Sequence, residues 1–335
     1  MLTITPISFS GIRNLPKSSF NNATLPKLGQ DSFSKRNNVS FRGNGAEFAN
    51  WMRENEFCLH DIQRMICDEN LIGAGNYSTV FSIPECDEYV LKVSNYDVDS
   101  IKTADLSQAR LKINDEELGI NIGQKVAAIE IPTIFPMPME IQVLKKQAGE
   151  SVGVQPPETI KENEKSYEDY SRKEKYERTI HKLAQLPVES YEQLLSDFVE
   201  ADRLGYVFDY LNSNNLLVDE ENKKINLIDM EKYGLAGNLS GLLYSLTNAQ
   251  YYRTYCDKYY MPVSEAQREQ ATNDTIEIIK KFTLAMKKQG LKFDRNKVTY
   301  EANTYLFGGY PCWLAFGAMN EYQVWDRLSQ MGLVK

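Results

Sequence analysis

The stretch V-F-D-Y-L-N-S-N-N-L-L-V-D-E-E-N-K-K-I-N-L-I-D, Val207–Asp229, decides how the chain is interpreted. Two apolar runs flank the polar segment E-E-N-K-K, which is typical of two strands joined by a turn. Asp209 and a group of asparagines precede the first run, and Asp229 ends the second. A carboxylate directly after an apolar strand suits a hard cation, which prefers oxygen ligands. The stretch is therefore either a site with an acid and metal ligands or an Asn-rich turn.

A glycine-rich segment lies upstream, L-I-G-A-G-N-Y-S-T-V-F, Leu71–Phe81. Gly73 and Gly75 let a hairpin backbone lie close over phosphates, although a G-x-G in a hairpin is more often a tight turn. The next strand-like run, E-Y-V-L-K-V, places Lys92 between two apolar residues. A lysine that points inward from such a strand is costly unless it is paired. Lys92 is therefore a candidate functional residue.

In combination, these motifs resemble the protein kinase-like superfamily. Its members carry G-x-G-x-x-G-x-V, then a strand V-A-I-K, then H-R-D-x-x-x-x-N and a metal-binding Asp. The loop here has Ser78 in place of the third glycine and Val80 at the valine position. Asp229 opens D-M-E instead of D-F-G, 14 residues after Asn215. The resemblance covers about residues 65–235 and is nearest to reduced bacterial effector kinases.

The resemblance implies an α+β, bilobal protein kinase-like fold that binds ATP with Mg²⁺. Lys92 would hold the α- and β-phosphates. Asp229 would hold the metal together with Asn214 or Asn215. The residues implied to cover the nucleotide are Gly73, Gly75, Ser78 and Val80.

The position of the catalytic base depends on whether Asn214 or Asn215 is aligned with the asparagine of the kinase motif. Alignment on Asn215 places Tyr210 at the base position, where a phenol of pKa near 10 is a poor base at neutral pH. Alignment on Asp209 gives the spacing D-x-x-x-x-N with Asn214, and Asp209 is the carboxylate available near a substrate hydroxyl. The sequence favours Asp209 and leaves Tyr210 open.

In kinases the strand lysine also pairs with a helix glutamate. A helix is expected over about 100–118, with Gly119 as its C-cap. On that helix Glu117 shares a face with Leu106 and Ile113. Glu117 is therefore the candidate partner of Lys92, and the alternative is a surface acid beside the cap.

Three regions are expected along the chain. Residues 1–45 carry a net charge of +5 and leave −13 on the remainder. They are expected to be a disordered basic tail, either a secretion signal or a plain flexible segment. Residues 46–148 are expected to begin with short helices and then form a β-rich N-lobe, and 149–335 a helical C-lobe. The expected strands are 76–83, 88–93, 125–131 and 139–144.

Composition excludes several classes of function. The net charge of −8 disfavours a general nucleic-acid binder. No apolar run approaches the roughly 18–20 residues that span a membrane. The five cysteines are scattered and form no C-x-x-C pair, which favours reduced thiols in a cytosol-like setting. With two histidines, the chemistry has to come from Asp, Asn, Lys and backbone groups.

These observations predict an ATP- and Mg²⁺-dependent phosphotransferase that acts on a hydroxyl, in a protein substrate by preference. One alternative is a pseudokinase that binds nucleotide or a partner without transfer. Another is a small-molecule kinase of the aminoglycoside or choline type, which the acidic body permits. A cytoplasmic protein is expected, and the alternative is an effector that is secreted into a host cell. The substrate and the oligomeric state are not encoded in any motif.

Overall fold

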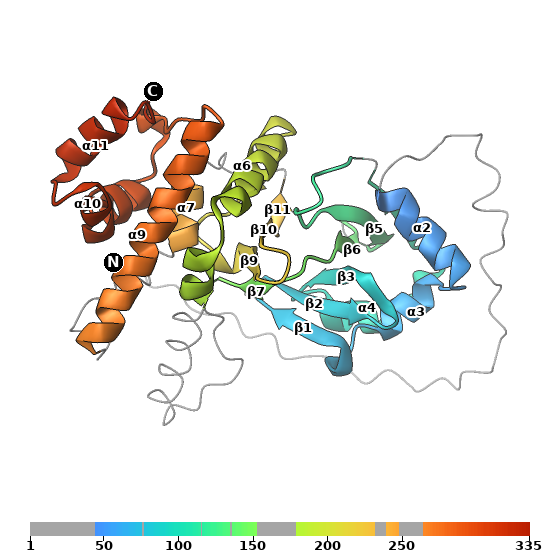
Figure 1. Cartoon of the computed structure of the whole chain (residues 1–335). Helices are drawn as coiled ribbons and strands as arrows, with labels where there is room; N and C mark the ends of the chain where they lie inside the picture. Colours follow the sequence, from blue (N-terminus) through green and yellow to red (C-terminus); the bar gives the residue numbers. More distant parts are fainter. Residues whose placement is uncertain are drawn as a thin grey trace, which may run out of the picture. The chain divides into compact units, whose positions relative to one another are not determined.

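The computed structural model describes residues 44–75, 77–114, 116–134, 136–152, 179–231, 239–247 and 264–335 (Figure 1). Nearly all of the basic segment 1–45, most of the charged stretch 155–186 and the aromatic run Tyr251–Tyr260 lie outside the described residues. The expectation about the basic tail therefore remains a prediction.

Two amphipathic helices open the described chain, as the sequence predicts. They are α2 (Asn44–Glu54) and α3 (Leu59–Arg64). Phe48 and Ile62 on these helices are fully buried in one hydrophobic cluster with the strands that follow. The helices thus cover the apolar face of a sheet.

That sheet has six antiparallel strands in the order β1-β2-β3-β6-β5-β4. The four strands that the sequence predicts are β2, β3, β5 and β6. The strand bounds are β1 (Leu71–Ala74), β2 (Ser78–Ile83), β3 (Cys86–Ser94), β4 (Arg110–Ile113), β5 (Lys125–Ile131) and β6 (Met139–Lys145).

The register gives the two faces of the sheet different characters. Residues directly opposite one another in an antiparallel pair project to the same face. One such row is Phe81, Leu91, Val143 and Ala127, all buried in the cluster with α2 and α3. The adjacent row projects to the opposite face and contains Gly73, Val80, Lys92, Gln142, Ala128 and Lys112. Lys92 therefore lies on the face away from α2 and α3.

The helix expected over 100–118 is wrong. The structure has α4 (Val98–Thr103), a 3₁₀ turn over Leu106–Gln108, and then the edge strand β4. Residues of β4 alternate between exposed and half-buried, because one side of the strand packs on the sheet. Glu117 is consequently in a connecting loop and is exposed.

The remaining described chain contains short strands and most of the helices, gathered around a second hydrophobic cluster. The strands form a three-stranded sheet in the order β10-β9-β7 and the pair β11-β8. Their bounds are β7 (Glu150–Ser151), β8 (Val207–Phe208), β9 (Leu216–Asp219), β10 (Lys224–Leu227) and β11 (Met230–Glu231). The named helices are α6 (Val188–Arg203), α7 (Leu239–Thr247), α9 (Glu265–Lys288), α10 (Tyr310–Phe316) and α11 (Glu321–Gln330).

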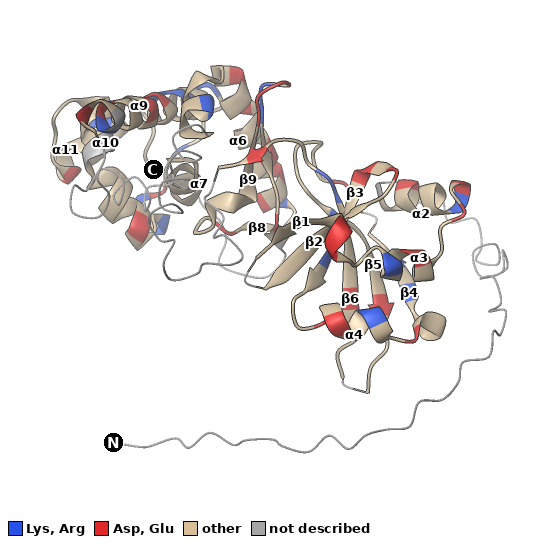
Figure 2. Ribbon diagram, turned by 90° about the horizontal axis from the view of Figure 1, so that it is seen from below, with Lys and Arg blue, Asp and Glu red and all other residues tan. Residues whose placement is uncertain are grey.

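The longest of these helices, α9, follows the apolar spacing of its sequence. Ile279, Phe282 and Met286 are fully buried, and Ile276 is half-buried. The helix ends before Gly290, which has φ +66°, a value that favours glycine. None of the described helices is long and apolar enough to cross a membrane. Acidic and basic residues are interspersed over the described helices and strands (Figure 2).

Candidate functional site

Lys92 and Asp229 form an ion pair between two elements far apart in the sequence. The Lys92 ammonium donates to Asp229 Oδ1. The side chain of Lys92 is 15% exposed and that of Asp229 36% exposed. Lys92 comes from the middle of β3, and Asp229 lies between β10 and β11. The pair thus connects the face of the six-stranded sheet that carries Lys92 to the segment between β10 and β11.

The backbone at Asp229 is held in an unusual conformation. Its φ of +57° lies in the left-handed region, which costs a non-glycine residue about 1–2 kcal/mol. The kink separates Leu227, which pairs in β10, from Met230, which pairs in β11. Such strain is concentrated at functional sites, because neighbouring structure has to enforce it.

Asn215 lies close to Asp229 in the fold, and both are candidate metal ligands. Its carbonyl accepts from the backbone N–H of Ile228, 2.9 Å away, and Ile228 directly precedes Asp229. Its side chain is 4% exposed, and among the described residues Nδ2 has no hydrogen-bond partner. Asn214 is oriented differently, because its Oδ1 accepts from the Ser151 hydroxyl at 2.9 Å. The structure therefore places the backbone of Asn215 beside Ile228, the neighbour of Asp229 in the chain, and bonds the Asn214 amide to Ser151 of β7.

Asp209 reaches the same place through the short pair β8–β11. Phe208 pairs with Met230, so Asp209 and Asp229 are the next residues beyond that pair on the two strands. Asp209 is exposed, and its Oδ1 accepts from the Leu211 N–H at 3.1 Å. One carboxylate oxygen of Asp209 thus caps the turn, and the side chain keeps access to solvent.

Tyr210 packs away from this group. Its ring meets that of Tyr244 edge to face, with centroids 6.4 Å apart. A Cβ added at Gly241 would lie 2.8 Å from Tyr210 Cγ, so the ring lies directly against α7. Burial, reinforced by the nearby Glu301 carboxylate, raises the pKa of Tyr210 above its usual value. The phenol is neutral at physiological pH and is held by packing.

The glycine-rich hairpin leaves open space over the sheet. A Cβ at Gly73 would meet nothing within 4 Å, and one at Gly75 would meet only Ser78 O, at 3.5 Å. Neither glycine has a positive φ within the described backbone. The hairpin is closed by Gly75 N–H donating to Ser78 O at 2.8 Å. Neither packing nor backbone conformation within the described chain therefore requires glycine at these two positions.

One residue of this face was missed by sequence reasoning, and one predicted contact is absent. Gln142 on β6 lies opposite Lys92. The alternation of M-E-I-Q-V-L reveals a strand but not its neighbour, so no local signal identifies Gln142. Glu117 makes no ion pair with Lys92 among the described residues, and the acid that Lys92 contacts is Asp229.

No protein-family model matches the chain, and none of the curated proteins matches it. The arrangement therefore has to be interpreted from its own chemistry. Within the described ranges, no cluster of three or more His, Cys, Asp or Glu side chains is placed to hold a metal ion. A cation held here would take its ligands from one carboxylate, an amide and the bound substrate, which is the common mode for Mg²⁺.

Proposed function

We propose that the protein is an ATP- and Mg²⁺-dependent phosphotransferase with a bilobal, protein kinase-like fold. In this proposal the six-stranded sheet with α2 and α3 is the N-lobe, and the helical cluster is the C-lobe. The transferred phosphate goes to a hydroxyl, and a protein substrate is favoured. The proposal rests on the sequence motifs and on the geometry of their residues.

One observation carries the proposal. The Lys92–Asp229 ion pair joins two motif residues 137 positions apart in the chain, and two separate strand pairings place Asn215 beside Ile228 and Asp209 next to the Phe208–Met230 pair, on either side of Asp229 in the chain. Four polar residue positions assembled by non-local contacts are not expected from an ordinary Asn-rich turn. They are the positions that phosphoryl transfer requires.

The residues near Asp229 fit a magnesium ion. The Asp229 carboxylate is partly exposed, so it can accept a second cation in addition to Lys92. Asn215 has a buried amide end without a partner among the described residues, and an amide that turns by 180° presents its oxygen there. Asn214 is the poorer ligand, because Ser151 already occupies its amide oxygen. When bound, Mg²⁺ would neutralise charge on the phosphates.

The protein groups would then act mainly by position and charge. Lys92 would exchange its contact with Asp229 for the nucleotide phosphates when these enter over Gly73 and Val80. Asp209 would accept the proton of the substrate hydroxyl, because it is exposed and adjacent to Asp229. Preorganised charges of this kind supply most of the acceleration in phosphoryl transfer.

The direct test is transfer of radiolabelled γ-phosphate to a protein mixture and to the chain itself. Wild type should label, and Lys92→Ala and Asp229→Asn should each lose at least about 100-fold. Lys112→Ala is the matched control, because Lys112 lies on the same face of the sheet and pairs with Glu130 at the exposed edge. Labelling that survives both site substitutions would reject the proposal.

A second experiment assigns the base. Asp209→Asn should lower transfer by about 10²–10⁴-fold, the usual contribution of general acid–base catalysis. Tyr210→Phe should retain transfer, because the neutral Tyr210 phenol packs against α7. The opposite result, with loss in Tyr210→Phe alone, would assign the role to Tyr210.

A second function is favoured by one observation. The Asp209 carboxylate is already engaged by the Leu211 N–H, and Lys92 is engaged by Asp229. A protein in which these contacts persist would bind nucleotide without transferring phosphate. Thermal stabilisation by ATP with Mg²⁺, without labelling under any condition, would support this pseudokinase function.

A further inference from the structure

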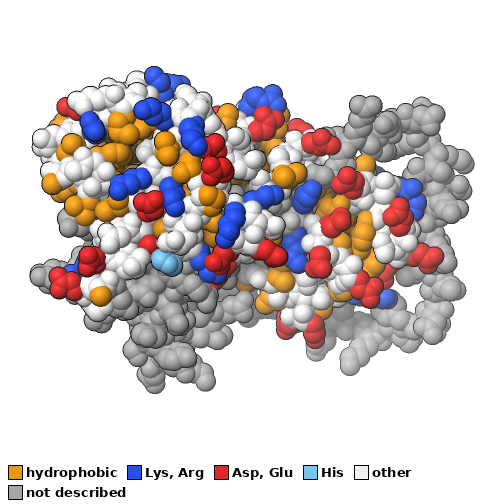
Figure 3. Space-filling model, viewed as in Figure 1, with side chains coloured by type: hydrophobic (Ala, Val, Ile, Leu, Met, Phe, Trp, Pro, Cys, Tyr) orange, Lys and Arg blue, Asp and Glu red, His pale blue; other side chains and the backbone are white. Residues whose placement is uncertain are grey.

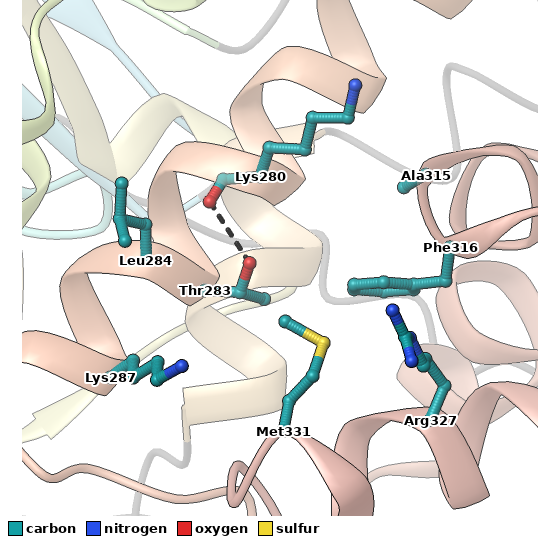
Figure 4. A pocket seen from close by; sticks show the side chains of 8 residues that line it. All are labelled: Lys280, Thr283, Leu284, Lys287, Ala315, Phe316, Arg327 and Met331. Atoms are coloured by element: carbon teal, nitrogen blue, oxygen red, sulfur yellow. Dashed lines mark hydrogen bonds between the residues drawn. The ribbon is translucent and has the colours of Figure 1, made fainter.

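A cavity in the helical region combines three cationic side chains with an apolar lining. Its volume is about 340 Å³, within the range of small-molecule sites. It lies between α9, α10 and the end of α11, and shares no residue with the Lys92–Asp229 group (Figure 4). The lining residues are Lys280, Thr283, Leu284, Lys287, Ala315, Phe316, Arg327 and Met331.

One face of α9 supplies half of the lining. Lys280, Thr283, Leu284 and Lys287 follow the spacing i, i+3, i+4, i+7, which places them along one side of a helix. Neighbouring lysines on the other side have protein partners: Lys281 donates to the carbonyls of Ala184 and Leu186, and Lys288 pairs with Glu192. The described residues offer no acid to Lys280 or Lys287. The two cations on the cavity side of α9 are exposed and have no acid partner among the described residues.

Arg327 completes the group from α11. In the close-up its guanidinium lies next to the Phe316 ring and to the right of the Met331 side chain (Figure 4). Its one hydrogen bond among the described residues is a long one, 3.5 Å, to Gln330. The described part of the chain contributes no acid to the lining of the cavity.

Helix ends alone do not account for the three cations. Lys287 and Arg327 lie in the last turns of their helices, where the dipole favours a positive charge. Lys280 lies in the third-last turn of α9, outside the reach of that effect. All three nevertheless line one cavity with Leu284, Phe316 and Met331. Blue and orange side chains are interspersed over this part of the surface (Figure 3).

We propose that this cavity binds a small amphipathic anion, with a carboxylate or phosphate head on an aliphatic or aromatic body. The head would meet Lys287 and Arg327, and the apolar body would lie against Phe316, Met331 and Leu284. Thioether and leucine side chains adapt to ligands of different shape. This proposal is independent of the phosphotransferase proposal, because the two sites use different residues.

The test uses decyl phosphate below its micelle concentration, titrated into the full chain by calorimetry. Saturable one-to-one binding is expected. Lys287→Gln and Arg327→Gln should each weaken it by about tenfold, the loss expected for one charge-assisted contact. Lys292→Gln is the control, because Lys292 is exposed near the end of the same helix and outside the lining. It should leave the affinity unchanged within about twofold.

Two further probes distinguish the source of the ligand and the contribution of charge. Decanol should bind at least about tenfold more weakly than decyl phosphate, because it lacks the charged head. Decanoate should bind like decyl phosphate. Binding restricted to vesicles of anionic phospholipid, without binding of the soluble probes, would overturn the proposal in favour of a membrane-facing surface. Loss of stability in Lys287→Gln and Arg327→Gln, without any anion binding by wild type, would overturn it in favour of a purely structural role.

Discussion

The Lys92–Asp229 ion pair gives the sharpest test of the structure, because it needs no assumption about function. The substitution Lys92→Met removes the charge and keeps an unbranched apolar stem of similar length, so packing against β2 and β6 is largely preserved. Asp229→Asn removes the opposite charge and keeps a residue that tolerates a positive φ. Together they isolate the electrostatic contact.

The expected size of the effect follows from exposure. A contact of about 4 Å at an effective dielectric of about 20 is worth about 4 kcal/mol before desolvation. Exposed pairs retain about 1 kcal/mol or less, and breaking a fully buried pair costs about 3–5 kcal/mol. With side chains 15% and 36% exposed, this pair lies between those cases. Lys92→Met should therefore lower the free energy of unfolding by about 1–2 kcal/mol.

The assay is urea denaturation of wild type, Lys92→Met, Asp229→Asn and the double variant. With a slope of about 3 kcal/mol per molar urea, the midpoint of Lys92→Met should fall by about 0.3–0.7 M. The double-mutant cycle should give a coupling of about 1 kcal/mol. Lys112→Met, which removes a more exposed pair, should cost about 0.5 kcal/mol or less. Additive effects of the two site substitutions would show that the side chains do not interact in solution.

Three further outcomes are expected. Gly73→Ala should change the free energy of unfolding by less than about 0.5 kcal/mol, because a Cβ at this position meets nothing within 4 Å. Gly149→Ala should cost about 2–4 kcal/mol in the same denaturation assay. Gly149 has φ +121°, and a Cβ there would lie 2.7 Å from the Val218 backbone. If the phosphotransferase proposal holds, Glu117→Gln should label as well as wild type within about twofold, because Glu117 is an exposed loop residue; a large loss would reinstate it as the partner of Lys92. Burial raises the pKa of the Asp197 carboxyl above its ordinary value, so its contribution to stability is present at low pH and is lost as pH rises through the raised pKa. The urea midpoint of Asp197→Asn should therefore depend less on pH across the mildly acidic range than that of wild type, and equal slopes would contradict the shift.

Local patterns in the sequence were sufficient for the elements with strong periodicity. The apolar runs of β2, β3, β5 and β6 identify these segments as strands, and the apolar stripe of α9 identifies both the helix and its buried face. The fold class of mixed α and β elements follows from these segments. Each of them is long enough for its own side chains to determine the outcome.

Elements that depend on distant partners were not readable in this way. The sequence of Arg110–Ile113 alone is compatible with the apolar stripe of a helix. These residues form β4 instead, because they complete the edge of the sheet against Ala127–Glu130. A helix over these residues would leave that edge of β5 unpaired, and the non-local pairing prevails over the local pattern. The expected direction of the Glu117 side chain depended on that helix, so it does not hold for a residue in a connecting loop.

In the candidate site, too, the sequence identifies residues but not the contacts between them. Lys92 and Asp229 were identified from their places in apolar strands, but their contact depends on chain segments 137 residues apart. The strands β8 and β11 have two residues each, too few for any periodicity, and yet they bring Asp209 next to Asp229. The Asn214 and Asn215 alternatives are separated by the bonds to Ser151 and Ile228, which no sequence spacing encodes.

The two separate hydrophobic clusters have an optical consequence. Trp51 stacks on Phe57 beside the cluster of the six-stranded sheet, whereas Trp313 and Trp325 belong to the helical cluster, where Trp325 meets Phe307 at 4.4 Å. The three indoles of the chain are thus divided between the two cores. Their emission reports two environments, and replacing Trp51 by Phe leaves a tryptophan emission that arises from the helical core alone. The chain carries its own fluorophores for following each core without an added label.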